Sequence, residues 1–553
     1  MSERWYKQAV IYSLDVETFQ DANGDGIGDL PGLISRLDYL SRLGVTCLWL
    51  NPIHPTPNRD DGYDITDFYG IDPNIGSLGD FAEFLHQADN RGLRVIIDLV
   101  VNHTSDEHPW FQSARSDPRS PYHDWYVWSK DEPPDRRQGM VFPGHQKETW
   151  TFDEEAQAWY YHRFYDFQPD LNFANPEVRA EIHKVVAFWL RLGVDGFRMD
   201  AAPFILELTR PGEPEPQQDF SILDDLHAIT TWRRGDAVTL AEANVGKDEL
   251  LEYFGDGNRL PMMFNFLLNQ RTFLALARAD ATPVVAALEA SPSIAEPCQW
   301  ATFLRNHDEV DLGRLGQHER DEVFTAFGPD PDMRLYHRGI RRRLAPMLDG
   351  DQRRLRMAYA LQCTLPGTPV IRYGDEIGMG EDLSLRERNA IRTPMQWTDQ
   401  PNGGFSSIAP KRTVRPVITG GDYGYEKINV LAQRGRSDSL LSFMEQMLPT
   451  LRECPEFGSG TCEPIDVGHR SVLALRFEAS TGSMLALTNL AARRCVADAS
   501  AVSTGHAVEV FADDDYDPID ATLENLTLNG YGFRWIRLGW EIPSGPPPPT
   551  WPS

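Results

Sequence analysis

The sequence has few cysteines and a small share of basic residues. Its six cysteines are scattered over 553 residues, and none has the paired spacing of a zinc or iron–sulfur site. Only Cys454 and Cys462 are close enough to suggest a local disulfide. Lys and Arg number 53 against 82 Asp and Glu, a formal net charge of -29. This imbalance argues against nucleic acid or an anionic membrane as a partner.

Long hydrophobic runs are also missing. The first residues, Met1 to Lys7, include no apolar signal region, and no stretch is long enough to cross a bilayer. We therefore expect a cytoplasmic protein with no membrane partner. The hydrophobic content of 41% is nevertheless sufficient for a large core.

What the sequence does contain is a recurring unit of amphipathic helix, glycine turn and apolar strand. In one copy, Leu33, Leu37 and Leu40 share a helical face before Gly44 and the strand at 45–50. The other strands are expected at 9–14, 237–242, 262–266, 301–306 and 368–373 and in two runs that end at Asp98 and Asp200. A doubly wound sheet uses the same unit, but eight copies favour a closed (β/α)8 barrel of the α/β class.

Several segments depart from this alternation. Residues 103–179 are rich in Trp, Tyr, Pro and Asp, and 309–360 form a second long interruption. Beyond about residue 460 the sequence changes to short alternating strands. The expected organisation is barrel at 1–102, inserted domain at 103–179, barrel at 180–459 with a lid-like insertion near 309–360, β-sandwich at 460–543 and Pro-rich tail at 544–553.

Three carboxylates stand at the ends of apolar runs. Asp200 closes Gly-Phe-Arg-Met-Asp, Glu242 closes Val-Thr-Leu-Ala-Glu, and Asp308 closes Phe-Leu-Arg-Asn-His-Asp. An earlier run ends in Asp98 and His103. Because charged groups beside buried strands are costly unless they are paired or functional, the pattern favours a catalytic cluster at the carboxyl ends of barrel strands.

Together with Arg59-Asp-Asp-Gly-Tyr-Asp64 and Arg392-Thr-Pro-Met-Gln-Trp397, these runs resemble the signature regions of the α-amylase superfamily, glycoside hydrolase family 13. The likeness is greatest to its trehalose synthases (maltose α-D-glucosyltransferases). The resemblance implies a TIM barrel with an inserted domain B after strand 3 and a C-terminal antiparallel β-sandwich. It also implies a homodimer as one arrangement that this group adopts.

The resemblance assigns roles to the carboxylates. Asp200 would be the nucleophile of a retaining double displacement, and Glu242 the general acid/base. Asp308 would bind sugar hydroxyls and support substrate distortion. Arg198, two residues before Asp200, can keep that acid ionised through a charge-assisted hydrogen bond.

Other matching residues would bind the substrate. His103 and His307 lie where the family binds hydroxyls of the glucosyl unit. Tyr63 would stack on the sugar, while an ion pair between Asp60 and Arg392 would close the far end of the pocket. A closed end would favour small α-glucosides over starch; the alternative is a loop with a surface salt bridge.

A calcium site is predicted in the segment from Asp21 to Asp29. Asp21, Asn23, Asp25 and Asp29 recur at alternating positions, and Ile27 can offer its carbonyl. Oxygen ligands of this kind suit Ca²⁺, in a structural role and without an organic cofactor. The loop lacks the twelfth-position Glu of an EF-hand, and Mg²⁺ or a metal-free Asx turn is the alternative.

The reaction itself is left between alternatives. Trehalose synthases carry a Tyr four residues after the nucleophile and an acidic pair after the Asn-His-Asp motif. By resemblance these positions form a gate that shuts the site, and here they hold Phe204, Glu309 and Gly313. The lost hydroxyl and carboxylate predict a more open gate, which would admit water or foreign acceptors. The leading hypothesis is isomerisation by transfer between a small α-glucoside and a sugar acceptor. An α-glucosidase or intermolecular transglucosylase is the second, and a non-catalytic carbohydrate-binding relative is the third.

Overall fold

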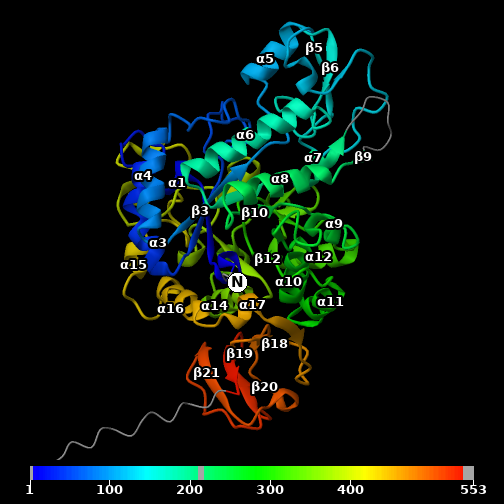
Figure 1. Cartoon of the computed structure of the whole chain (residues 1–553). Coiled ribbons are helices and arrows are strands. Elements are labelled where there is room, and N and C mark those ends of the chain that lie inside the picture. Colours follow the sequence, from blue (N-terminus) through cyan, green and yellow to red (C-terminus); the bar gives the residue numbers. More distant parts are fainter. Residues whose placement is uncertain (1–3, 209–216, 540–553) are drawn as a thin grey trace, which may run out of the picture.

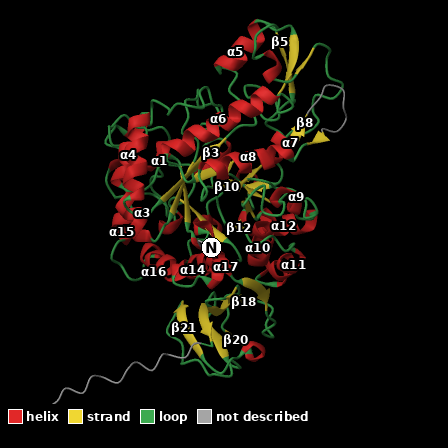
Figure 2. Cartoon of the chain, in the orientation of Figure 1, coloured by secondary structure: helices red, strands yellow, loops and turns green. Residues whose placement is uncertain are grey.

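A closed barrel of eight parallel strands forms the centre of the molecule. The computed structural model describes residues 4–208 and 217–539, and the predicted Pro-rich tail at 544–553 lies outside them. Figure 2 shows the strands enclosed by helices. The barrel strands are β1 (Ile11–Leu14), β2 (Cys47–Leu50), β3 (Arg94–Leu99), β7 (Gly196–Met199), β10 (Val238–Ala241), β11 (Met262–Phe264), β12 (Gln299–Thr302) and β16 (Thr368–Arg372). They pair in the order β1-β16-β12-β11-β10-β7-β3-β2, which confirms the predicted (β/α)8 class.

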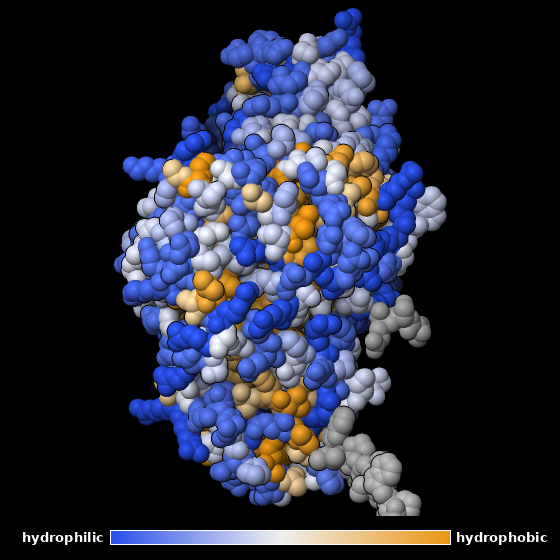
Figure 3. Space-filling model, turned by 90° about the vertical axis from the view of Figure 1, so that its left-hand side faces the viewer, coloured by the Kyte–Doolittle hydropathy of each residue, from blue (hydrophilic) through white to orange (hydrophobic). Residues whose placement is uncertain are grey.

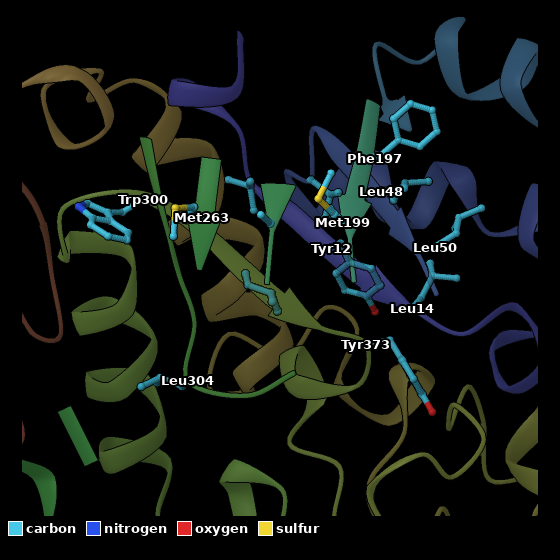
Figure 4. Packing of buried hydrophobic residues seen from close by; sticks show 14 of the residues in the cluster. Tyr12, Leu14, Leu48, Leu50, Phe197, Met199, Met263, Trp300, Leu304 and Tyr373 are labelled. Atoms are coloured by element: carbon cyan, nitrogen blue, oxygen red, sulfur yellow. The ribbon is translucent and has the colours of Figure 1, made fainter. Parts of the chain in front are cut away.

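The two faces of the barrel wall are both buried, as the unbroken apolar runs predict. Ile11, Trp49 and Phe264 belong to the cluster that fills the barrel interior. Side chains at alternate positions pack outward in the main core; Figure 4 shows Tyr12, Leu48 and Met199 among them. The interior is therefore a packed core, and the ends of the strands are left for chemistry.

Helices connect the strands and cover the wall. The principal ones are α2 (Leu30–Ser35), α3 (Leu37–Leu43), α4 (Leu78–Asp89), α6 (Pro176–Leu192), α8 (Ser221–Arg233), α10 (Phe266–Arg278), α11 (Thr282–Ala290), α14 (Gln352–Thr364) and α16 (Leu440–Arg452). In α4, Ser77 and Asp80 form a reciprocal capping box, a device whose N-cap contributes about 1 kcal/mol. Helix α3 ends at Gly44, whose φ of 98° is left-handed. That conformation suits glycine and turns the chain directly into β2.

Two additional units lie at opposite ends of the barrel (Figure 1). The chain leaves the carboxyl end of β3 into α5 (Pro109–Ser116) and a sheet of β4 (Trp128–Ser129), β5 (Trp150–Asp153) and β6 (Ala158–Tyr161). This insertion therefore stands over the end of the barrel where the predicted carboxylates lie.

The C-terminal unit is built from two antiparallel sheets. One contains β17 (Thr461–Pro464), β18 (Val472–Ala479), β19 (Gly482–Asn489), β23 (Phe533–Leu538) and β21 (Ala507–Ala512), and the other β20 (Cys495–Ala497) and β22 (Leu526–Leu528). A separate apolar cluster lies between them. The unit meets the barrel through α17 (Glu456–Ser459), which contacts the 3-10 helix η1 (Trp5–Gln8) immediately before β1. It therefore lies at the amino end of the strands.

The last long interruption contains its own secondary structure. A small sheet contains β13 (Val310–Asp311), β15 (Gly339–Ile340) and β14 (Arg334–Leu335) in that order. Helix α12 (Gln317–Phe327) lies between β13 and β14 along the chain. The strand predicted at 301–306 is misplaced, because β12 is Gln299–Thr302. The chain leaves the wall after Thr302, where its polar residues turn into the site.

Further expectations concern the cysteines and the surface. All six cysteines are free thiols, so Cys454 and Cys462 form no disulfide. Among the described residues, no helix combines the length and apolar character that crossing a bilayer requires. On the face shown in Figure 3, hydrophilic residues predominate and hydrophobic ones form separate small areas.

Candidate active site

A cavity of about 510 Å³ lies at the carboxyl ends of the strands. The insertion and the β13–β15 segment both contribute to its wall. Its lining includes Asp60, Tyr63, His103, Val141, Phe142, Phe164, Asp200, Phe204, Glu207, Glu242, Asn244, His307, Asp308, Glu309, Asp311, Gly313, Arg314, Arg338 and Arg388. All three predicted catalytic carboxylates are therefore brought to one cavity from three different strand ends.

Arg198 joins two of the three carboxylates. Its Nη1 donates to Asp200 Oδ1 at 2.7 Å, and its Nη2 donates to Glu242 Oε2. Strands β7 and β10 are neighbours in register, with Arg198 opposite Leu240, so the two acids emerge side by side. One guanidinium therefore holds both acids on the same side of the cavity, an arrangement compatible with the paired carboxylates of a retaining enzyme.

The pKa values of this pair suit an acid and a nucleophile. Burial raises the pKa of Glu242 to about 7, although Arg198 opposes the shift. Burial also raises the pKa of Asp200 to about 6, again against Arg198. Between these values Asp200 is ionised and Glu242 still carries its proton. That is the combination needed to attack a sugar and protonate its leaving group.

Asp308 is held in the opposite state. Burial opposes its ionisation, but the guanidinium groups of Arg388 and Arg392, each 3.0 Å from Oδ1, outweigh this effect. They hold the pKa of Asp308 far below its usual range. Asp308 is therefore a permanent anion, suited to accept hydrogen bonds from sugar hydroxyls.

The predicted sugar-binding residues form one network. Tyr63 OH lies 2.7 Å from His307 Nε2 and donates to Asp98 at 2.8 Å. Burial lowers the pKa of His307 well below its ordinary value and that of His103 to about 4. Both imidazoles are therefore neutral at working pH. His103 Nε2 is held 2.8 Å from the Tyr63 carbonyl.

The predicted ion pair between Asp60 and Arg392 is wrong. Arg392 pairs with Asp61 instead, and its Nε donates to the His307 carbonyl at 2.8 Å. Asp61 has a left-handed φ of 49°, which separates its direction from that of Asp60. Asp60 accepts from Gln168 at 2.9 Å and lines the cavity. Arg392 thus positions Asp308 from behind, while Asp60 remains available to substrate.

Two residues with a large share in the site were missed by sequence reasoning. Arg388 donates from Nε to Glu309 at 2.8 Å and pairs with Asp308. Asp61 links Arg392 to Arg415. Arg388 lies in the 3-10 helix Glu387–Ile391, outside the quoted motifs, and Asp61 lies in a turn within Arg59-Asp-Asp-Gly-Tyr-Asp64, next to the acid that was chosen. In the sequence, only the charged residues in 381–388 and the two consecutive acids at 60–61 pointed to these roles.

The residues at the predicted gate are now placed. Glu309 holds Arg388, and its side chain packs on Gly339. The ring of Phe204 lines the cavity, meets Phe164 edge to face at 5.6 Å and lies under the Arg163 guanidinium. Gly313 is exposed at the edge of the cavity.

The 21–29 loop lies away from the cavity and is organised by its own backbone. Asp21 Oδ1 accepts from Gly24 N, Asn23 Oδ1 from Asp25 N, and Asp25 Oδ1 from Ile27 N. Asp29 caps α2 through Gly32 N. Within residues 4–208 and 217–539, no three His, Cys, Asp or Glu side chains converge as metal ligands. The loop has the form of successive Asx turns, whose oxygen donors match the chemistry of a hard cation.

Comparison with known proteins agrees with this geometry. Residues 12–457 match the model of the α-amylase catalytic domain. The chain is 43% identical to a trehalose synthase of Thermus thermophilus, covering 97% of this chain and 56% of that protein. It is 40% identical to the trehalose synthase/amylase TreS of Mycobacterium tuberculosis, covering 98% and 92%.

A solved structure extends the comparison. The trehalulose synthase MutB of Pseudomonas mesoacidophila MX-45 superposes with a TM-score of 0.77 at 25% identity, over 97% of this chain and 100% of that one. The chain spans little more than half the length of the Thermus protein. The matched domain, the barrel and the carboxylates at its strand ends together establish that this chain belongs to the α-amylase family.

Proposed function

We propose that this protein is a retaining α-glucosyl-transferring enzyme of the trehalose-synthase type, which interconverts maltose and trehalose. The observation that carries the proposal is the pair Asp200 and Glu242 on one guanidinium, inside a cavity walled by two separate insertions. Its volume of about 510 Å³ suits a small molecule rather than a polymer. The trehalose synthases described above support the choice of trehalose.

The reaction begins with the bound disaccharide. Asp200 attacks the anomeric carbon as Glu242 gives its proton to the glycosidic oxygen, so the glucosyl unit becomes bonded to Asp200 and free glucose is formed. Asp308, held anionic by Arg388 and Arg392, accepts hydrogen bonds from the glucosyl hydroxyls. These bonds strengthen as the ring distorts toward the transition state.

Isomerisation then depends on keeping the released glucose. Glu242, now a carboxylate, removes the proton from the 1-hydroxyl of that glucose, whose oxygen attacks the anomeric carbon and frees Asp200. Attack by water at the same point gives hydrolysis instead. The outcome is therefore decided by what confines the acceptor, not by the carboxylates.

A product profile tests the proposal. Purified protein is incubated with maltose and, separately, with trehalose, and the sugars are followed by anion-exchange chromatography. We expect each disaccharide to appear from the other with little free glucose. Glucose as the sole product would establish the second candidate, an α-glucosidase, which the replacement of a gate tyrosine by Phe204 favours. Absence of any turnover would overturn both.

We also propose that the 21–29 loop binds Ca²⁺ in a structural role. Ca²⁺ at about 100 times its Kd would stabilise the fold by about 2.7 kcal/mol, so chelation is expected to lower the unfolding temperature. Differential scanning calorimetry with EDTA or added Ca²⁺ measures this. Asp25→Ala should remove the response, while Asp256→Ala, an exposed control outside the loop, should keep it. An unfolding temperature that ignores both additions would refute the metal site.

A further inference from the structure

The lining of the cavity differs in burial from one part to another. Asp200, His307 and Asp308 are at most 8% exposed. Asn244, Asp311 and Arg338 line the same cavity but are only half-buried, with side-chain exposures of 19% for Asp311 and 25% for Arg338. We call these last three residues the acceptor rim.

The acceptor rim adjoins the acid/base through Asn244. Asn244 follows Glu242 by two residues, and its Nδ2 donates to Asp311 Oδ2 at 3.1 Å. Glu242 has to lie beside the glycosidic oxygen that it protonates, so the leaving sugar projects past the residues next to it. A leaving sugar that projects past Asn244 would therefore meet Asp311.

Arg338 connects the acceptor rim to the inserted domain. Its Nε bonds Asp311 Oδ2 at 3.2 Å, and its Nη1 donates to the Val141 carbonyl at 3.1 Å. Asp311 and Gly339 are paired across β13 and β15, which holds Arg338 beside the carboxylate. The two segments that wall the cavity are thus joined through Arg338.

The position of Asp311 bears directly on the glycine at 313. A Cβ at Gly313 would lie 2.9 Å from Asp311 Oδ1 and 3.1 Å from Arg338 Cδ. The carboxylate of Asp311 thus already occupies the space next to the position where the resembled group carries an acid. The Gly313 amide donates to this carboxylate at 2.6 Å.

We propose that Asp311, held by Arg338 and Asn244, is the specificity-determining residue that retains the released sugar on the acceptor side of the cavity. The proposal rests on the proposed function and specifies how isomerisation prevails over hydrolysis despite Gly313. Asp311 accepts a hydroxyl hydrogen bond from the free sugar, and the Arg338 contact to Val141 closes the rim around it. Glucosyl transfer to Asp200 does not require it.

The proposal is tested by measuring how often the released sugar leaves the cavity before it is transferred. Protein is incubated with unlabelled maltose plus ¹³C-glucose, and label entering trehalose and maltose is measured by mass spectrometry together with free glucose. In Asp311→Asn we expect label uptake and the ratio of hydrolysis to isomerisation to rise about tenfold, the weight of one charge-assisted hydrogen bond. The first half-reaction, followed as fluoride release from α-glucosyl fluoride, should change less than about twofold, since it uses no sugar acceptor.

Matched variants separate this role from a structural one. Asp321→Asn removes an exposed carboxylate from α12 and should behave as the parent. Arg338→Gln keeps the Asp311 carboxylate but removes the guanidinium that bonds both Asp311 and the Val141 carbonyl. It should also raise label uptake. Asp311→Asn with Gly313→Glu returns a carboxylate to the rim and should restore retention.

The outcomes distinguish the two proposals. A parent that isomerises, with unchanged label uptake in folded Asp311→Asn and Arg338→Gln, would overturn the role of Asp311 and leave the function standing. A parent that yields only glucose would overturn the function itself. Circular dichroism confirms that the variants compared are folded.

Discussion

Replacing Asp200 with Asn is expected to lower turnover of maltose by at least about a thousandfold, because it removes the attacking charge with almost no change in volume. The amide can still accept the hydrogen bond from Arg198 Nη1, so the buried guanidinium keeps that partner. Initial rates with maltose and an unchanged far-ultraviolet spectrum are the measurements. Activity within tenfold of the parent would show that Asp200 is not the nucleophile.

A control for this variant is available at the same strand level. Asp98 lies opposite Arg198 in the β3–β7 register and accepts from Trp49 and Tyr63. Asp98→Asn removes a buried charge next to the same arginine but no reacting group. It should retain substantially more activity than Asp200→Asn. Equal losses of activity would mean that both reflect the lost charge of the cluster and not the loss of the nucleophile.

Glu242→Gln is expected to reduce turnover of maltose by about 10²- to 10⁴-fold, the usual contribution of a general acid/base. A donor with a good leaving group, α-glucosyl fluoride, does not need the acid. It should still load Asp200, and added azide should then release the sugar as glucosyl azide without a base. Chromatography of that product is the measurement. Failure of azide to restore turnover of the fluoride would count against the assignment.

The pH dependence provides a second check on Glu242. In the parent, activity should fall below about pH 6 as Asp200 gains a proton and above about pH 7 as Glu242 loses one. These apparent values belong to the coupled pair. In Glu242→Gln the alkaline fall should vanish from azide-supported turnover, because the amide does not titrate. Its acid limb should stay near pH 6, because Glu242 already carries its proton in the parent where Asp200 titrates.

The site residues that could be predicted from the sequence are those on the barrel strands or directly after them. Asp200 and Glu242 were predictable because each directly follows an apolar run, and neighbouring parallel strands bring their ends together. The role of Arg198 followed from the same register. These inferences needed only local periodicity and the closure of one barrel.

The remainder depended on loops. Asp61, not Asp60, meets Arg392 because of one left-handed residue, and Arg388 reaches Asp308 from a segment eighty positions away. Neither contact leaves a periodic trace in the sequence. The loss of a carboxylate at Gly313 suggested an open gate, whereas the folded chain places Asp311 beside that position. Such a shift of one charge by two residues is visible only when β13 and β15 are paired.

The C-terminal sheets meet the amino end of the barrel through α17 and η1, at the pole remote from the insertion (Figure 1). Attachment to a solid support through that pole would leave the cavity facing the surrounding liquid. Sugars could then diffuse in and out as freely as in solution. The C-terminal unit is therefore a suitable attachment point for an immobilised catalyst, because the full depth of the barrel separates it from the cavity.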